Sequence, residues 1–500
     1  MAVNGYYTGF DLSDLTSLYA PWEETGGQWR PRFSHSAALL SFELSSSAYD
    51  MDLDAWRKAG WHDFSYQIDN KLFTGAAVNK NENGAAVVGA SNGHFQRFVQ
   101  AKLNRKNPIS QLRGALRQRD GSDTCKAVVM IHPIPGGRYL VAIGFMGTGK
   151  RFYDWFSNFR LASEEGVHSG FLQITREFEK NCGLISFPET ARELNADQLT
   201  LSDILDECRK PGSRFLIWMA GHSQGGAVMQ LFSFREIRKG LLRRNMIGYG
   251  FASPSVIYEN PCCDPCSFPL YHIINSDDVF PRMGAATHMG RCWIMTPDAE
   301  MRSVCYREAW EDPCFRSVLA LMRRVTDSGG AFLLTAAMLQ ALETVNQSDA
   351  IAVLNGLMGH LVPEKLLEPL SSRREDILHA LHRRTLKGFA LASGKEDMPV
   401  SLLYALQGRI TQIISLYGAK AFSRSVLSCL SFPHKLRGSD PDGWIASYQY
   451  ILTERFDGLQ QKVWCAPASG METAISRGGK RLPGGRYASL SAARNRRTGR

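Results

Sequence analysis

The chain has 500 residues, too many for one packed core, and this length predicts two to three structural units. With 44% hydrophobic and 21% charged residues, 45 Gly and 21 Pro, the composition is that of a globular protein, which excludes wholesale disorder, a collagenous rod and a coiled coil. Most of the formal net charge of +10 lies at the C-terminal end, because the last thirty residues contain eight Lys or Arg and one Glu. We expect this Gly-, Ser- and Arg-rich tail, residues 471–500, to be a solvated extension, with docking on anionic lipid or nucleic acid as the alternative.

The sequence favours a cytoplasmic protein. The first residues lack the cationic and apolar pattern of a secretory signal peptide. The most apolar segment, Ala331 to Leu342, is little more than half as long as a membrane span. Eleven cysteines, an odd number in a long chain, suit a reducing compartment better than a disulfide framework. Export without a cleaved signal stays open.

The first quarter of the chain, residues 1–125, is expected to pack on the core. Residues 33–70 carry apolar groups at helical spacing and then Trp56, Trp61 and Tyr66, which predicts a helix leading into a strand or hairpin. Residues 76–125 are Gly- and Asn-rich and then basic, so we interpret them as a variable connection.

Residues 126–300 predict an α/β core. An apolar run from Ala127, a Pro-Gly-Gly turn and a second run, Tyr139–Phe145, indicate two strands joined by a tight reversal. Short apolar runs then alternate with helical patterns, which predicts a mostly parallel sheet covered by helices on both faces. The expected helix is Ala227–Lys239. The expected strands are Phe215–Ala220, Met246–Ala252, Leu270–Asn275 and Arg291–Met295. After about residue 300 the strands stop, and residues 301–470 are interpreted as an appended helical region.

Two segments match the G-x-S-x-G pattern that places a serine on a strained strand-to-helix turn. Gly221–Gly225 follows an apolar run and continues through Gly226 and Ala227 into a helical pattern, and small residues are what so tight a turn requires. Gly89–Gly93 is followed by bulky His94 and Phe95 instead. Ser223 is therefore the candidate nucleophile, and Ser91 is assigned to an ordinary loop.

A nucleophilic serine needs oxyanion donors and an acid that orients its base. The strand Tyr139–Phe145 ends in Met-Gly-Thr, so Thr148 can supply one donor, and the backbone N–H of Gln224 can supply the other. A plain turn at this point is the alternative. Asp277 and Asp278 follow the strand Leu270–Asn275, and an acid at the carboxyl end of a parallel strand lies where a site forms. The pattern leaves open which of the two acts, or whether both only form a surface turn.

Taken together, these motifs resemble the class 3 (fungal-type) lipases in order and spacing, over about residues 35–296. The motifs that carry the resemblance are Val141–Thr148, Asp154-Trp155, Asn158, Val167–Phe171, Gly221–Gly225 and Asn275–Pro281. The resemblance implies an α/β-hydrolase fold that cleaves acylglycerols and related esters through a Ser-Asp-His triad. It implies Ser223 as nucleophile, Thr148 and Gln224 as oxyanion donors and Asp278 as the acid. His168 and Asp154-Trp155 match framework positions.

The resemblance also implies a lid over residues 149–166, where aromatic side chains form an apolar face suited to a lipid surface. One position departs from the family, which usually has Arg where this chain has Met146. The contacts that this Arg makes in the family must be made in another way in this chain.

The family places the catalytic histidine after the last core strand, in a loop that leads to the final helix. His288 matches a framework position, and His379 and His382 lie in a basic stretch typical of a solvated face. His360 and His434 are the other late histidines. We choose His360 as the base because it follows Gly359 and precedes Leu-Val-Pro, a helix break from which a loop could direct it.

Three rival interpretations are weaker. Gly144–Lys150 matches a phosphate-binding loop through its lysine, but Arg151 stands where such a loop needs Ser or Thr for Mg²⁺. Cys263 and Cys266 form a CxxC without a spaced second pair, so a metal site is not predicted. A non-catalytic lipid-binding or scaffold protein on the same fold stays open, because fold does not entail chemistry.

The sequence therefore predicts a serine ester hydrolase, most simply a lipase, with Ser223, Asp278 and His360 as its triad. The reaction passes through an acyl-enzyme and needs no cofactor or metal. The expected partner is a lipid or ester substrate, with transient contact to a lipid surface through residues 149–166 or the basic tail, and no nucleic acid partner is expected.

Overall fold

The computed structural model describes residues 2–23, 33–68, 71–74, 77–80, 86–89, 125–147, 163–164, 166–258, 265–282, 287–325, 330–358, 379, 382–383, 385–386, 390, 399–438 and 442–462. All of them lie in one compact unit, Met1–Ala466. The decoy serine Ser91 lies outside the described residues, as do Thr148, His360, the loop residues Lys150 and Arg151 and nearly all of the expected lid.

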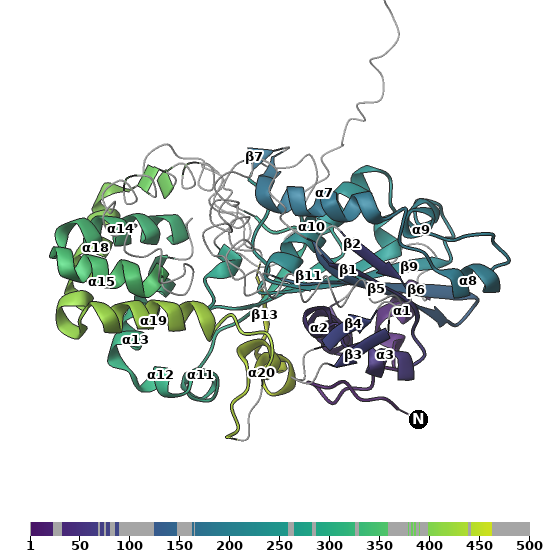
Figure 1. Cartoon of the computed structure of the whole chain (residues 1–500). Coiled ribbons are helices and arrows are strands. Elements are labelled where there is room, and N and C mark those ends of the chain that lie inside the picture. Colours follow the sequence, from purple (N-terminus) through teal and green to yellow (C-terminus); the bar gives the residue numbers. More distant parts are fainter. Residues whose placement is uncertain are drawn as a thin grey trace, which may run out of the picture. The chain divides into compact units, whose positions relative to one another are not determined.

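A nine-stranded sheet forms the centre of the described chain, in the order β13-β12-β11-β10-β9-β6-β5-β1-β2 (Figure 1). The five strands from β6 to β12 in this order run parallel, and the strands outside them pair antiparallel. The strands are β1 His62–Ile68, β2 Lys71–Thr74, β5 Lys126–Ile134, β6 Arg138–Phe145, β9 Phe215–His222, β10 Met246–Phe251, β11 Leu270–Asn275, β12 Arg291–Met295 and β13 Gln460–Lys462. Two small ribbons are separate: β3 Ala77–Lys80 with β4 Ala86–Gly89, and β7 Ser163–Glu164 with β8 Val167–His168.

This arrangement confirms the predicted α/β class, the hairpin at β5 and β6, and the parallel strands of the core. One expectation was wrong. The strands do not stop after about residue 300, because β13 pairs with the edge strand β12. Its three residues, Gln-Gln-Lys, are polar and exposed. Hydrophobic periodicity therefore could not reveal this strand.

Helices cover both faces of the sheet because side chains alternate along each strand. On β9, Leu216, Trp218 and Ala220 face the cluster that includes α2, whereas Ile217 and Met219 face the cluster that includes α7 and α10. Figure 1 shows α7 and α10 on one side of the sheet and α2 on the other. The helices around the sheet are α1 Thr16–Glu23, α2 His35–Asp50, α3 Asp54–Lys58, α7 Ser169–Asn181, α8 Pro188–Glu193, α9 Leu201–Glu207 and α10 Gln224–Arg238.

Helix α2 is more buried than an ordinary surface helix. Ser34 caps its first turn, and eleven of its sixteen residues are buried, among them Glu43. The Glu43 carboxylate accepts hydrogen bonds from the backbone N–H groups of Tyr7 and Thr8 (2.9 and 2.7 Å) and from the Thr8 hydroxyl (2.9 Å). Burial nevertheless raises the pKa of Glu43. The N-terminal segment is thus held on α2 by a buried carboxylate.

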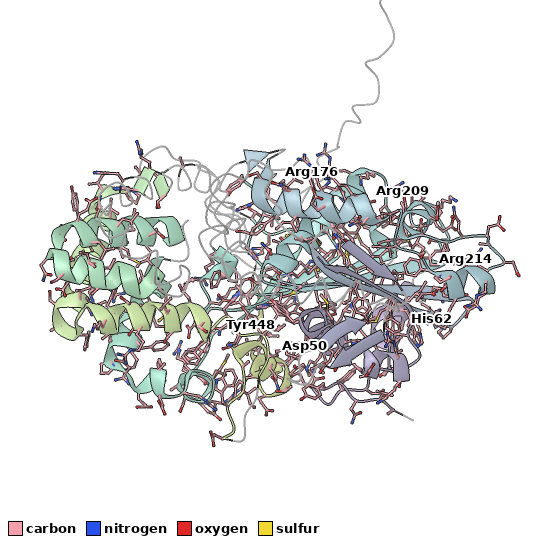
Figure 2. All side chains as sticks on the ribbon, viewed as in Figure 1. Asp50, His62, Arg176, Arg209, Arg214 and Tyr448 are labelled. Atoms are coloured by element: carbon pink, nitrogen blue, oxygen red, sulfur yellow. The ribbon has the colours of Figure 1, made fainter. Side chains whose placement is uncertain are left out.

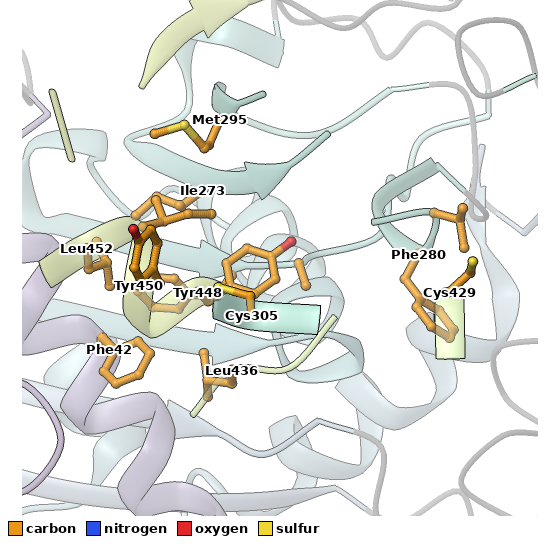
Figure 3. Packing of buried hydrophobic residues seen from close by; sticks show 14 of the residues in the cluster. Phe42, Ile273, Phe280, Met295, Cys305, Cys429, Leu436, Tyr448, Tyr450 and Leu452 are labelled. Carbon is orange, nitrogen blue, oxygen red and sulfur yellow. The ribbon is translucent and has the colours of Figure 1, made fainter. Parts of the chain in front are cut away.

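The later part of the described chain is helical, as expected. Its helices are α11 Ala299–Tyr306, α12 Glu308–Glu311, α13 Pro313–Val325, α14 Gly330–Thr344, α15 Gln347–Met358, α18 Val400–Tyr417, α19 Ala419–Ser431 and α20 Ser447–Thr453. None of the helices among the described residues has the length and hydropathy of a membrane-spanning segment. Helix α20 packs back on the core. Tyr448, Tyr450 and Leu452 join Phe42 of α2 and Ile273 of β11 in one cluster (Figure 3).

A buried ionic cluster ties the end of β11 to this helical region. The Asp277 side chain is fully buried and accepts hydrogen bonds from the Arg302 guanidinium (2.8 and 3.1 Å) and the Tyr306 hydroxyl (3.1 Å). The Arg323 Nε also lies 3.1 Å from Asp277 Oδ1. Asp277 is therefore neutralised by two guanidinium groups.

We expect Asp277→Asn to lower the free energy of unfolding by roughly 3 kcal/mol, because it leaves the largely buried Arg302 guanidinium without a counter-charge. Urea denaturation measures this change. The matched control is Asp206→Asn, which breaks an exposed ion pair with Arg209 and should cost less than about 0.5 kcal/mol. Equal losses in the two variants would contradict the structural role assigned to Asp277.

Candidate active site

Ser223 lies on the turn from β9 to α10 with φ 55° and ψ −126°. A positive φ is costly for any residue with a Cβ, so the surrounding packing must hold the serine in this conformation. The neighbouring glycines show how. A Cβ on Gly225 would overlap the carbonyl of Phe145, and one on Gly226 would overlap the Ser253 hydroxyl. Only glycines let the helix start this close to the ends of β6 and β10, as the tight turn predicted.

The segment after β6 passes directly beside the serine. A Cβ built on Gly147 would lie 3.2 Å from the Ser223 Cβ and would overlap the Tyr49 hydroxyl and the His222 carbonyl. Gln224 is the first residue of α10, at the positive end of the helix dipole. The expected oxyanion segment and the expected nucleophile are thus adjacent, although Thr148 itself lies outside the described residues.

The two adjacent aspartates have different partners. Asp277 binds arginines, as described above, whereas the Asp278 carboxylate lies 2.9 Å from His434 Nδ1 and accepts a hydrogen bond from the Tyr448 hydroxyl (2.8 Å). Both carboxylates are buried, at 1% exposure each. The burial of Tyr448 and the charge of Asp278 raise the pKa of that phenol well above its usual value, so it remains a donor. Only Asp278, of this pair, has an imidazole to orient.

The imidazole on Asp278 belongs to His434, not to the predicted His360, which lies outside the described residues. A carboxylate can only accept, so the hydrogen bond places a proton on His434 Nδ1 and leaves Nε2 with its lone pair. The His434 ring lies 4.2 Å from the ring of Phe280 and 4.7 Å from that of His222, the residue before Ser223. This imidazole therefore lies beside the turn that carries the serine.

The other histidines considered from sequence have different surroundings. His288 is buried, with Nε2 2.7 Å from the Ser253 carbonyl, and burial lowers its pKa to about 4. His168 caps α7 and stacks on Phe171. Both are framework contacts. Among the described residues, no group of three or more His, Cys, Asp or Glu side chains is arranged to hold a metal ion.

The sequence analysis named His434 among the late histidines but chose His360, because of the helix break at that position. One signal could have selected it. His434 lies between α19 and α20, in a loop that leads to the final helix, which is the position the family resemblance implied. His360 precedes several further helical segments instead.

The fold and the site define a class: an α/β protein with a serine on a strand-to-helix turn and an acid–imidazole pair beside it. Residues 143–288 match the family described as Lipase (class 3). This match bears out the resemblance to the class 3 lipases over residues 143–288, and the mostly parallel sheet flanked by helices agrees with the α/β-hydrolase fold that the resemblance implied. No curated protein shows significant similarity to the chain.

Solved structures of fungal lipases resemble parts of the chain. Rhizomucor miehei lipase in its propeptide complex is 18% identical over 35% of this chain and 54% of that one, with a TM-score of 0.25. Rhizomucor miehei triacylglyceride lipase is 20% identical over 36% and 64%, with a TM-score of 0.24. The lipase of Rhizopus microsporus var. chinensis is 16% identical over 45% and 84%, with a TM-score of 0.25. The chain spans 54% and 64% of the length of the first two of these lipases.

The strain at Ser223 predicts an order of stability between two variants that both lack the hydroxyl. Ser223→Gly should have a free energy of unfolding higher than Ser223→Ala by about 1 kcal/mol, because only glycine adopts the positive φ without steric cost. Urea denaturation compares the two.

Ser213 provides the control, since it is a buried serine outside the set of described residues with positive φ. There the order should reverse, with the alanine variant more stable than the glycine variant, because glycine loses more backbone freedom on folding. The same order at both positions would argue against strain at Ser223.

Proposed function

We propose that the chain is a serine ester hydrolase of the lipase type that cleaves acylglycerols or related lipid esters. The observation that carries this proposal is the hydrogen bond from His434 Nδ1 to Asp278, next to the turn that holds Ser223. It gives the imidazole the tautomer that a general base needs. The triad of the proposal is therefore Ser223, Asp278 and His434, with His434 in place of His360.

The mechanism follows from these groups. His434 Nε2 takes the proton of the Ser223 hydroxyl as Oγ forms a bond to the ester carbonyl carbon. Asp278 stabilises the imidazolium that results, and the backbone N–H of Gln224 and the predicted donor Thr148 stabilise the oxyanion. The imidazolium then donates its proton to the leaving alcohol, and an acyl-enzyme remains. A water activated by the same imidazole releases the carboxylic acid and restores the serine.

The environment of Asp278 supports this division of roles. A buried carboxylate is costly unless hydrogen bonds compensate for its lost hydration, and Asp278 has both an imidazole and a phenol as donors. Asp277, one residue earlier, is already neutralised by arginines. The expected lid over 149–166 and its contact with a lipid surface remain part of the proposal, as does the lipid nature of the ester.

Labelling with a fluorescent alkyl phosphonate tests the hydrolase directly. The parent should be labelled stoichiometrically and Ser223→Ala not at all, because the reagent modifies only an activated serine. With a p-nitrophenyl ester, His434→Ala should lose about 10⁴-fold or more in kcat/KM, as expected for a triad member. His360→Ala and His379→Ala are the matched controls and should keep the parental rate. A parent that is folded but never labelled would favour the non-catalytic lipid-binding alternative.

The phenol on Asp278 gives a second, finer test. Tyr448→Phe removes one of the two side-chain hydrogen bonds of the carboxylate, which also accepts one from the backbone N–H of Phe280, and should lower kcat/KM about 10-fold, because hydrogen bonds to charged groups contribute roughly 1.5–3 kcal/mol. Tyr450→Phe, on the same helix, removes a hydroxyl away from Asp278 and should leave the rate unchanged. Parental activity in Tyr448→Phe would show that the phenol only fills space.

A further inference from the structure

The last turn of α2 makes two separate contacts with the groups around Ser223. It carries Tyr49 and Asp50 in succession (Asp50 is labelled in Figure 2). The Tyr49 hydroxyl lies 2.7 Å from His222 Nδ1, and the Asp50 carboxylate forms an ion pair with Arg437. His222 immediately precedes Ser223, and Arg437 follows His434 by three residues. Two adjacent residues of α2 thus contact the neighbours of the proposed catalytic residues: Tyr49 contacts the residue before Ser223, and Asp50 contacts a residue shortly after His434.

His222 connects this turn to the backbone of His434. Its Nε2 lies 2.9 Å from the His434 carbonyl oxygen, which can only accept, so Nε2 carries the proton. His222 Nδ1 then has the lone pair and accepts the hydrogen bond of the Tyr49 hydroxyl. Tyr49, His222 and the His434 carbonyl therefore form one directed chain of hydrogen bonds.

The charge state of His222 suits this role. The side chain is buried, and burial together with the nearby His434 holds its pKa well below the usual value. A neutral His222 does not repel the imidazolium that His434 becomes during the proposed reaction, although the two rings are only 4.7 Å apart. It also keeps one tautomer, since both of its nitrogens have fixed partners.

Arg437 holds the other end of the His434 loop. Its guanidinium binds both oxygens of Asp50, and it donates hydrogen bonds to the Tyr7 hydroxyl (2.8 Å) and the Ser46 carbonyl (3.2 Å). It also lies over the rings of Tyr7 and Tyr49. These contacts use the planar fork of arginine, which lysine does not reproduce. The loop is therefore attached to α2 by a rigid, multiply bonded side chain.

We propose that His222 and Arg437 are positioning residues for ester hydrolysis, which together hold the backbone of His434 against the last turn of α2. The inference rests on the proposed function, because it assigns a purpose to the placement of the proposed base. Neither residue exchanges a proton with the substrate. Both limit the movement of an imidazole whose displacement by about 1 Å can cost on the order of 100-fold in rate.

The test measures kcat per active site, with the number of sites counted by phosphonate titration of each purified variant. His222→Leu and Arg437→Met should each lower this kcat about 10-fold to 100-fold and change KM less than about 2-fold, because the serine and the substrate site are intact while the base is displaced. His222→Gln keeps an N–H donor for the His434 carbonyl and should recover most of the loss. Arg437→Lys should recover less, because it keeps the charge but not the fork.

Matched controls separate positioning from general stability. His132→Gln changes a histidine whose Nε2 also lies near a backbone carbonyl, that of Ala59, and Arg235→Met breaks the paired hydrogen bonds to Glu179. Both lie away from the proposed triad, so they should lower the thermal unfolding midpoint and leave kcat per active site unchanged. Tyr49→Phe removes a single oxygen atom and should fold normally; we expect its kcat to fall about 3-fold to 10-fold, because the His222 ring loses one of the two hydrogen bonds that hold it.

The outcomes distinguish this inference from the proposed function. A parent that is not labelled at Ser223 overturns both. An active parent with His222→Leu, Arg437→Met and Tyr49→Phe all within about 2-fold of its kcat per active site overturns the positioning role alone. Fewer titratable sites with an unchanged kcat at those sites would likewise show that the two residues only stabilise the fold.

Discussion

The buried carboxylate of Asp278 is the constraint on which the site depends. A carboxylate removed from water must be compensated by hydrogen bonds, and the two side chains that donate to it, His434 and Tyr448, come from the far end of the compact unit in sequence. The end of β11 is therefore incomplete until residues more than 150 positions later have folded onto it. Assembly of the C-terminal segment on the core and completion of the acid–imidazole pair are one event.

The rest of the C-terminal segment shows the same dependence. The loop after His434 runs beside the start of α20, where the N–H groups of Tyr448 and Gln449 bond to the carbonyls of Lys435 and Leu436. The Ser447 hydroxyl donates to the carbonyl of Phe432, just before the loop. Helix α20 in turn buries its aromatic face against α2 and β11, so apolar packing sets the position of the polar groups. The packing of the hydrophobic cluster in Figure 3 thus positions the donors of the hydrogen bonds to Asp278.

The parts of the fold and site that the sequence predicted are those fixed by local chemistry. The bounds of β11 and β12 agree with the predicted residues because apolar runs of strand length delimit them. Ser223 was separated from the decoy Ser91 by the small residues that its strained turn requires. Asp278 was selected over Asp277 only with the family resemblance, since both follow the same strand and the arginines that occupy Asp277 are distant in sequence. His434 could not be predicted from the local sequence pattern. A histidine is identified as a base by its contact with a carboxylate, and tertiary packing brings the two side chains together.

The helical region lies in sequence between the acid and the proposed base, and this order explains why the base needs its own attachment to α2. Helix α19 ends at Ser431, three residues before His434, so any displacement of α19 would be passed directly to the imidazole. The family match, in contrast, ends at residue 288, before this region begins. The short loop is held on the core at three points. The Pro433 carbonyl accepts a hydrogen bond from Asn275, the His434 carbonyl accepts one from His222, and Arg437 forms an ion pair with Asp50. Such a loop isolates the imidazole from its neighbouring helix, and a helical region of this size can then vary or move without shifting the atoms on which the proposed chemistry depends.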